Sequence, residues 1–286
     1  MVNVFLVCPT CKKKGFIEIP EKMNKDPSGG ILAIDLEANI LCQHSFIIYL
    51  DSNLQVRECV IPDFKVELPE LKLEDQIRTK ALPNRDVFDI DLIKLNLPFM
   101  LLAHVLKSIF FKEKIVIISN QEFFFSHIYN FFKDITQDSF GIDIYVTNQD
   151  GYMKNKKKYK NCVVLEENKI LADNNKVINS KKLKVEKQIV KNFLSTYDLV
   201  YCYIMLKNEI NKAYELSKSI ADYVIKSKEA EELNQQIFTD FLKEKYQTKI
   251  SRTYLTFLCE IVKINFEVKD SRIFYPSKTF KSFWNS

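Results

Sequence analysis

Two short motifs near the N-terminus carry side chains able to bind a metal ion. Cys8 and Cys11 are separated by two residues, and Cys42-Gln43-His44 follows after a longer segment. Thiolate and imidazole groups are the ligands that Zn²⁺ prefers in tetrahedral structural sites. Lysines 12–14 directly follow the first pair, and we expect their charge to lower the pKa of the neighbouring thiols. The pattern predicts a structural zinc site with the ligands Cys8, Cys11, Cys42 and His44.

The fourth ligand stays open at this point. A Cys-x-His pair departs from the commoner second Cys-x-x-Cys pair of such sites, and Cys59 is the alternative to His44. A redox role for Cys8 and Cys11 is disfavoured because they open no thioredoxin-like βαβ pattern. Plain core cysteines are the remaining alternative. A closed site of four protein ligands has no position for water, so it would stabilise the fold and not catalyse.

The rest of the sequence contains no constellation typical of catalysis. The turn after residues 115–118 has no glycine, whereas phosphate-binding loops need glycines so that backbone amides can approach the anion. His104 and His127 lie in apolar segments, as core or boundary histidines usually do. We therefore expect a binding protein that is not an enzyme. An enzyme whose site is assembled from scattered carboxylates is the alternative.

Composition favours a cytoplasmic protein. The seven cysteines are an odd number, and Cys162, Cys202 and Cys259 have apolar neighbours typical of inert buried thiols. Residues 1–7 are typical of a strand and not of a signal peptide. No apolar run is long enough to span a bilayer. The net charge of +5 is mild and permits contact with an anionic partner without requiring it.

Two features indicate nucleic acid as an alternative partner. Residues 154–160 are the densest basic segment, which is either a solvated surface or a patch that contacts phosphate or anionic lipid. Residues 236–246 and 251–266 have helix-turn-helix spacing, with Arg252 at the start of the second helix and a wing predicted at 273–275. A regulator that uses the zinc ribbon and this helix pair would bind DNA with steep salt dependence.

The pattern of apolar residues predicts a multidomain α+β protein. Residues 1–62 form a small β-rich module, and residues 63–88 are rich in proline and charge, as linkers are. Residues 89–180 alternate helix and strand, which predicts an α/β domain with a mainly parallel sheet. Residues 181–286 are predicted to be helical, with a winged-helix-like end.

Three local predictions concern the α/β segment. Residues 91–111 are expected to form one apolar helix, with Pro98 near its start or at a kink. Residues 115–118 are uniformly apolar, which is typical of a strand buried on both faces. Ser119 and Glu122 have the spacing of a capping box and are expected to start the following helix.

Two family resemblances extend this interpretation. The segments 8–11, 41–46 and 51–57 resemble zinc-ribbon-like modules in multidomain proteins of Asgard archaea, where such a module accompanies signalling or trafficking domains. Residues 97–102 and 112–119 look like the helix-then-strand opening of the core lobe of DENN-type domains. The second resemblance implies binding to small GTPases, promotion of nucleotide exchange and a role in membrane traffic. It implies no site residues. The expected partner is therefore named only as a class of protein, the small GTPases.

Overall fold

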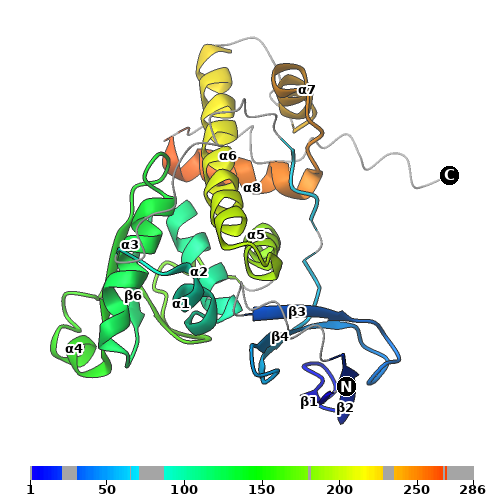
Figure 1. Ribbon diagram of the computed structural model, residues 1–286. Helices are drawn as coiled ribbons and strands as arrows, with labels where there is room; N and C mark the ends of the chain where they lie inside the picture. Colours follow the sequence, from blue (N-terminus) through cyan, green and yellow to red (C-terminus); the bar gives the residue numbers. More distant parts are fainter. Residues whose placement is uncertain are drawn as a thin grey trace.

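The computed structural model describes residues 2–20, 31–64, 66–70, 87–179, 182–227, 235–266 and 268. These residues form a mixed α/β protein with eight α-helices and three small sheets. The strands of the N-terminal module lie together at the lower right, β6 lies at the left beside α3 and α4 (all within residues 114–154), and α6, α7 and α8 (within residues 199–265) lie above (Figure 1). The loop predicted at 27–30 and the wing predicted at 273–275 lie outside the described residues.

The N-terminal module consists of two antiparallel sheets. The hairpin of β1 (Val2–Val7) and β2 (Lys14–Ile19) forms the first. The second has the order β3 (Ile31–Leu36), β4 (Phe46–Asp51), β5 (Val56–Val60). The β-rich character predicted for this part of the chain is therefore confirmed.

Strand β4 is buried along its whole length because it separates two hydrophobic cores. Successive side chains of a strand point to opposite faces. One set packs with the β1–β2 hairpin, and the other set packs with the helical part of the protein, where the ring of Tyr49 stacks on Phe99 at 5.8 Å. The residues facing the hairpin are Phe46, Ile48 and Leu50, and those facing the helices are Ile47 and Tyr49.

The single helix predicted over residues 91–111 is two helices. Helix α1 (Ile90–Asn96) and helix α2 (Phe99–Phe110) meet at an angle of 110°. Pro98 causes the break, because its ring disfavours helical geometry in the preceding residue, and Leu97 is extended with ψ of 114°. In the described part of the chain no single helix is long and apolar enough to cross a bilayer, and only this bent pair passes on length and composition.

A side chain from the β module caps helix α2. Pro98 offers no capping side chain, and the backbone N–H of Phe99 instead donates to Oε2 of Glu58 on β5, at 2.8 Å. Burial raises the pKa of Glu58, and the hydrogen bond from Phe99 opposes that rise. A carboxylate at a helix N-terminus also interacts favourably with the helix dipole. The β module and the helices are thus joined by a polar contact as well as by β4.

The third sheet is mainly parallel, as predicted. Its order is β7 (Asp143–Thr147), β6 (Lys114–Ile118), β8 (Cys162–Glu166), β9 (Lys169–Ala172), and only β9 is antiparallel to its neighbour. The buried strand predicted at 115–118 is confirmed as β6.

Helices cover both faces of β6. Ile115 and Ile117 belong to the main core, which includes α3 (Phe125–Ile135). Val116 and Ile118 face the opposite way, onto a small cluster that holds the short helix α4 (Gln149–Lys154). This double burial explains the uniformly apolar sequence of the strand.

The predicted capping box at Ser119 is wrong. Helix α3 begins at Phe125, after a 3₁₀ turn over Glu122–Phe124. The hydroxyl of Ser119 accepts from the backbone N–H of Gln121 at 3.3 Å, within the loop. Glu122 accepts instead from the side chain of Asn148, which caps α4. The loop after β6 is therefore longer than the spacing suggested.

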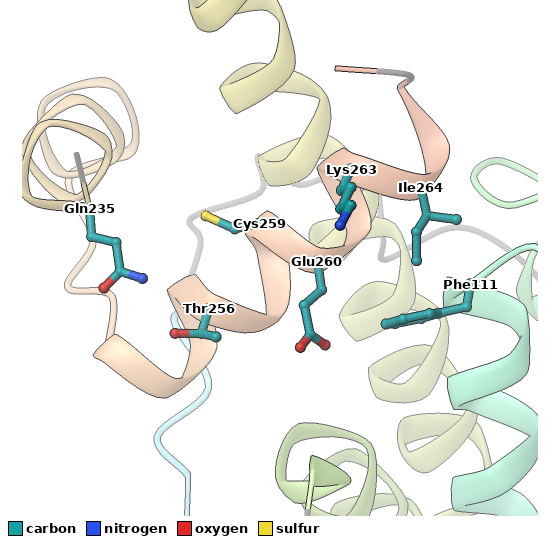
Figure 2. A pocket seen from close by; sticks show the side chains of 7 residues that line it. All are labelled: Phe111, Gln235, Thr256, Cys259, Glu260, Lys263 and Ile264. Carbon is teal, nitrogen blue, oxygen red and sulfur yellow. The ribbon is translucent and has the colours of Figure 1, made fainter. Parts of the chain in front are cut away.

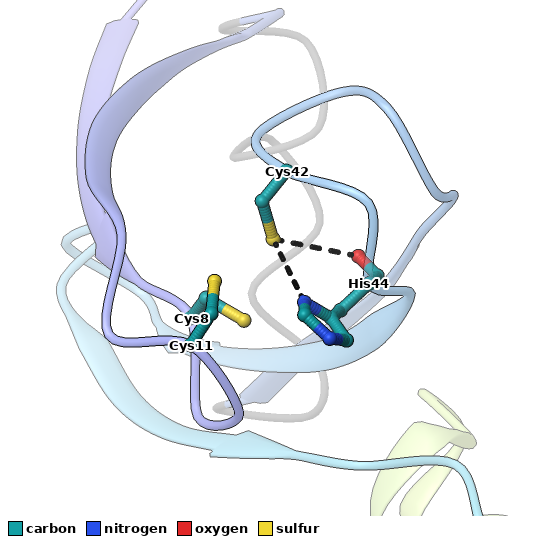
Figure 3. Close-up of side chains that lie close together, drawn as sticks. All are labelled: Cys8, Cys11, Cys42 and His44. Carbon is teal, nitrogen blue, oxygen red and sulfur yellow. Dashed lines mark hydrogen bonds between the residues drawn. The ribbon is translucent and has the colours of Figure 1, made fainter.

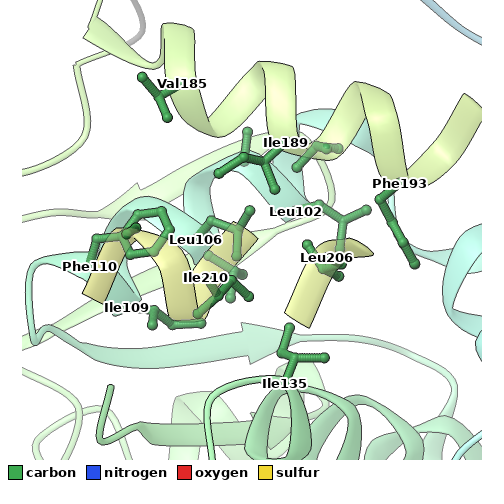
Figure 4. Packing of buried hydrophobic residues seen from close by; sticks show 14 of the residues in the cluster. Leu102, Leu106, Ile109, Phe110, Ile135, Val185, Ile189, Phe193, Leu206 and Ile210 are labelled. Atoms are coloured by element: carbon green, nitrogen blue, oxygen red, sulfur yellow. The ribbon is translucent and has the colours of Figure 1, made fainter. Parts of the chain in front are cut away.

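Four helices complete the described chain: α5 (Lys184–Ser195), α6 (Leu199–Lys226), α7 (Gln235–Tyr246) and α8 (Arg252–Asn265). Helix α5 packs on α2, α6 packs on α5 and α8, and α7 packs on α6, and their buried residues belong to one continuous core, part of which is shown in Figure 4. The predicted division near residue 180 stays a prediction, and the core is continuous across it. The ends of the predicted linker also pack in this core, through Phe64 and Phe88.

Candidate metal centre

Four side chains near the N-terminus gather into a group able to hold a metal ion. The sulfur and nitrogen atoms of Cys8, Cys11, Cys42 and His44 all lie within 4.8 Å of one another (Figure 3). Sγ of Cys42 lies 3.7 Å from Nδ1 of His44. Zn–S and Zn–N bond lengths give ligand–ligand distances of about 3.5–3.8 Å in a tetrahedral site. Small side-chain movements would therefore close this group around one ion.

The first ligand pair lies on the turn between β1 and β2. The N–H of Cys8 donates to the carbonyl of Lys13 at 2.9 Å, and the N–H of Lys12 donates to the carbonyl of Cys8 at 3.1 Å. Lys12 has a φ of 61°, which lets the chain reverse directly after Cys11. The turn directs both thiols to the same side (Figure 3).

The second pair lies on the loop between β3 and β4. The N–H of Asn39 donates to the carbonyl of Cys42 at 2.7 Å, and Asn39 has a φ of 76°, which asparagine tolerates better than most residues. Leu41 packs this loop onto the hairpin at Gly15, where an added Cβ would lie 2.5 Å from Cδ1 of Leu41. The absence of a side chain at Gly15 therefore lets the two ligand pairs approach each other.

The thiols of the group affect one another's ionisation. Burial raises the pKa of Cys8, but hydrogen bonds from the backbone N–H groups of Cys11 and Thr10 and from the side chains of Cys42 and Cys11 lower it to about 6. A backbone hydrogen bond at His44 lowers the pKa of Cys42, but burial and the two other thiols raise it overall. Gathered thiolates repel each other, and a divalent cation would relieve that repulsion.

The predicted lowering of a thiol pKa is thus found at Cys8, but the predicted cause is not. Lysines 12–14 are exposed, and the groups that lower the pKa of Cys8 are backbone N–H groups and neighbouring thiols. Nζ of Lys12 donates to the carbonyl of Pro9 at 3.0 Å.

Cys59, the alternative fourth ligand, does not belong to the group that the described residues form. It lies half-buried on β5 and packs against the core of the β module. Burial raises the pKa of its thiol, and the charges of Glu58 and Cys8 add to that rise. The geometry therefore favours His44 over Cys59.

The remaining histidines and the last three cysteines are buried or engaged, as their apolar neighbours in the sequence predicted. His127 accepts from the backbone N–H of Asp89 at 3.1 Å. His104 is buried without a hydrogen-bond partner, and burial lowers its pKa to about 4, which keeps the ring neutral. Burial raises the pKa of Cys202 to about 11 and of Cys259 to about 12, so both thiols stay protonated near neutral pH.

One buried ionic cluster was not predicted. Nζ of Lys107 on α2 donates to Glu260 on α8 at 3.1 Å and lies 3.4 Å from the fully buried Glu186 on α5. Glu260 also lines a cavity of about 370 Å³ between α8, Phe111 and the start of α7 (Figure 2). Lysine in an otherwise apolar helix was the one signal that could have indicated this cluster, because a buried charge needs a partner.

Comparison with protein-family models found no match for this chain, and comparison with curated proteins found none either. The proposal for the function therefore rests on the geometry of Cys8, Cys11, Cys42 and His44.

Proposed function

We propose that this chain is a cytoplasmic, non-catalytic interaction protein whose β module is held together by one structural zinc ion. The observation that carries this proposal is the convergence of three thiols and one imidazole from two separate loops. Four protein ligands complete the tetrahedral shell of Zn²⁺ and leave no position for a reacting water. The ion would bind both loops, supply folding free energy to a small module and perform no chemistry.

The proposed partner is a small GTPase, with a role in the regulation of membrane traffic. This rests on the resemblance to DENN-type domains of the segment that forms α2 and β6. In support, α2 leads directly into the central strand of a parallel sheet, which is the helix-then-strand order that the resemblance implies.

Nucleotide release from small GTPases of the same cell tests this partner. We expect the chain to bind a GDP-loaded GTPase with a Kd of about 1 μM or tighter, which corresponds to about −8 kcal/mol. Release of fluorescent GDP should accelerate as the chain is titrated, with EDTA-promoted release as the positive control. Neither binding nor faster release across the panel of GTPases would remove this partner class.

A second candidate function, binding of single-stranded nucleic acid, is favoured by the outer face of the β1–β2 hairpin. Phe5 and Phe16 pair across the strands at 5.3 Å in an edge-to-face arrangement, with 48% and 67% of their surfaces exposed. Exposed lysines 12–14 come shortly before Phe16 in the chain. Bases stack on exposed aromatic rings, and lysines attract the phosphates. Arg252 is likewise exposed at the start of α8.

For this second function we expect Phe5→Ala with Phe16→Ala to weaken binding of an oligonucleotide. Stacking contributes about 1–3 kcal/mol per base, so the loss should be tenfold or more by that estimate. Phe123→Ala is the matched control, because Phe123 is 66% exposed on another surface. Fluorescence anisotropy at increasing salt measures the effect, and no binding even at low salt would exclude the function.

A further inference from the structure

A basic surface with an apolar residue at its edge lies where α4 leads into β8. Five of the seven residues 154–160 are lysines, and all five are exposed. No aspartate or glutamate occurs from Gly151 to Asn161. Met153, at the end of α4, leaves 57% of its surface exposed. We call Met153 together with the five lysines the α4 surface. Its lysines are Lys154, Lys156, Lys157, Lys158 and Lys160.

Helix α4 and the segment that follows it are held by a helix cap, by stacked tyrosine rings and by a lysine–ring contact. Asn148 caps α4 by accepting from the N–H of Gly151 at 2.7 Å. Tyr152 stacks on Tyr159 at 6.1 Å, and both rings are buried against the sheet. The ammonium group of Lys158 lies 4.9 Å from the centre of the ring of Tyr145. The remaining lysines and Met153 are exposed. Helix α4 itself lies at the lower left in Figure 1.

Acidic groups near this surface leave its charge largely uncompensated. Asp150 is exposed in the first turn of α4. Asp143 on β7 pairs with Lys114 at 3.1 Å, and Glu113 accepts from Asn175 at 3.0 Å. The α4 surface therefore carries a net positive charge that suits an anionic partner.

The exposure of the tyrosine rings near this surface distinguishes between nucleic acid and a lipid bilayer as the anionic partner. A protein surface that binds nucleic acid offers exposed aromatic faces for stacking, but Tyr152 and Tyr159 are buried, and the ammonium group of Lys158 lies over the ring of the half-buried Tyr145. What the α4 surface exposes is a flexible apolar side chain beside lysines. That combination fits a bilayer, where an apolar residue enters the interface while lysines contact anionic headgroups.

We propose that the α4 surface docks this protein on an anionic lipid bilayer. The lysines supply the electrostatic attraction, and Met153 supplies a small apolar anchor. Docking is peripheral and reversible, because a single apolar side chain together with a basic patch gives no permanent insertion. The inference does not depend on the GTPase partner proposed above, and it is tested on the protein alone.

Flotation of the full chain with vesicles tests the proposal. We expect binding to vesicles of phosphatidylcholine and phosphatidylserine, little binding to phosphatidylcholine alone, and release as salt rises. Each lysine at an anionic surface contributes about fivefold, so Lys154→Gln, Lys156→Gln and Lys157→Gln together should lower the partition coefficient about 100-fold. The matched control removes the same charge from exposed lysines on α6 and α7: Lys218→Gln, Lys226→Gln and Lys243→Gln.

A second pair of variants isolates the apolar anchor at constant charge. Met153→Ser should weaken vesicle binding severalfold, whereas Ile225→Ser should not, although Ile225 is equally exposed at 56%. The proposal is overturned if wild type does not prefer anionic vesicles, or if the control triple variant loses as much as the α4 variant. It is equally overturned if the α4 lysines are needed for an oligonucleotide and not for vesicles.

Discussion

Cys8→Ser should abolish zinc binding and unfold the β module. Purified wild-type protein should contain about one zinc ion per chain by elemental mass spectrometry, and the variant should contain none. Structural zinc contributes about 10–16 kcal/mol of apparent binding free energy in small zinc-binding peptides, which is comparable with or larger than the stability of a whole domain. Chelation should have the same effect. Binding releases thiol protons, so zinc affinity should also weaken as the pH falls.

A control variant and a hydrogen-exchange measurement show whether the loss of zinc is specific to the four proposed ligands. Cys59→Ser should keep the ion, because Cys59 lies outside the ligand group, whereas His44→Ala should lose it. Hydrogen exchange should show lost protection in β1 and β2, which pack only in the small core beside the ligand group, and retained protection in β6, which has no residue in that core. Zinc retained in His44→Ala and lost in Cys59→Ser would show that the ligand set is wrong.

Lys107→Met should destabilise the protein by about 3–5 kcal/mol at neutral pH. It leaves the fully buried Glu186 without the cation 3.4 Å away, and breaking a buried ion pair has a cost of that size. The double variant Lys107→Met with Glu186→Leu should recover most of the loss, because apolar replacement of a buried pair is often neutral. Lys114→Met is the control, since its pair with Asp143 is exposed to solvent and should contribute little to stability.

The pH dependence of the Lys107 variant has a defined sign. Burial raises the pKa of Glu186, Lys107 opposes that rise, and the variant removes the opposition. A carboxyl with a raised pKa in the folded state binds its proton more tightly there, so its protonation favours folding at low pH. The destabilisation should therefore be small near the ordinary pKa of glutamate and grow as the pH rises above it. Denaturant titrations at acidic and alkaline pH measure this, and an equal loss at both would contradict the buried-charge explanation.

Local patterns in the sequence predicted the buried strand at 115–118 and the four residues of the ligand group. The run Ile115–Ile118 is apolar at every position because both of its faces are covered, and the predicted strand is confirmed. The paired spacing of Cys8 with Cys11, and of Cys42 with His44, identified four residues that the fold brings together. Both patterns extend over only a few residues. The first reflects the burial of apolar side chains, and the second reflects the preference of zinc for thiolate and imidazole ligands.

Features that depend on distant contacts were missed. The pair of Lys107 and Glu186 joins two helices that are far apart in sequence, and no local pattern connects them. Ser119 has the sequence of a helix cap, but Glu122 bonds to Asn148 on another loop, so the helix starts later. Pro98, expected at the start or at a kink of the helix over residues 91–111, separates two helices, but the bond from Phe99 to Glu58 of the β module was not predicted.

The burial of β4 on both faces restricts how this chain can evolve. Deletion of a single residue within 46–51 would move the side chains on one side of the deletion to the opposite face, for example turning Tyr49 away from the helices and towards the hairpin. Insertions are tolerated far better in surface loops, such as the exposed turn at 52–53. We therefore expect related sequences to vary in length in that turn but not within β4. The same strand makes the β module a poor candidate for transfer to another protein. One face of β4 packs into the core of the helical part, and transfer would expose that face to solvent.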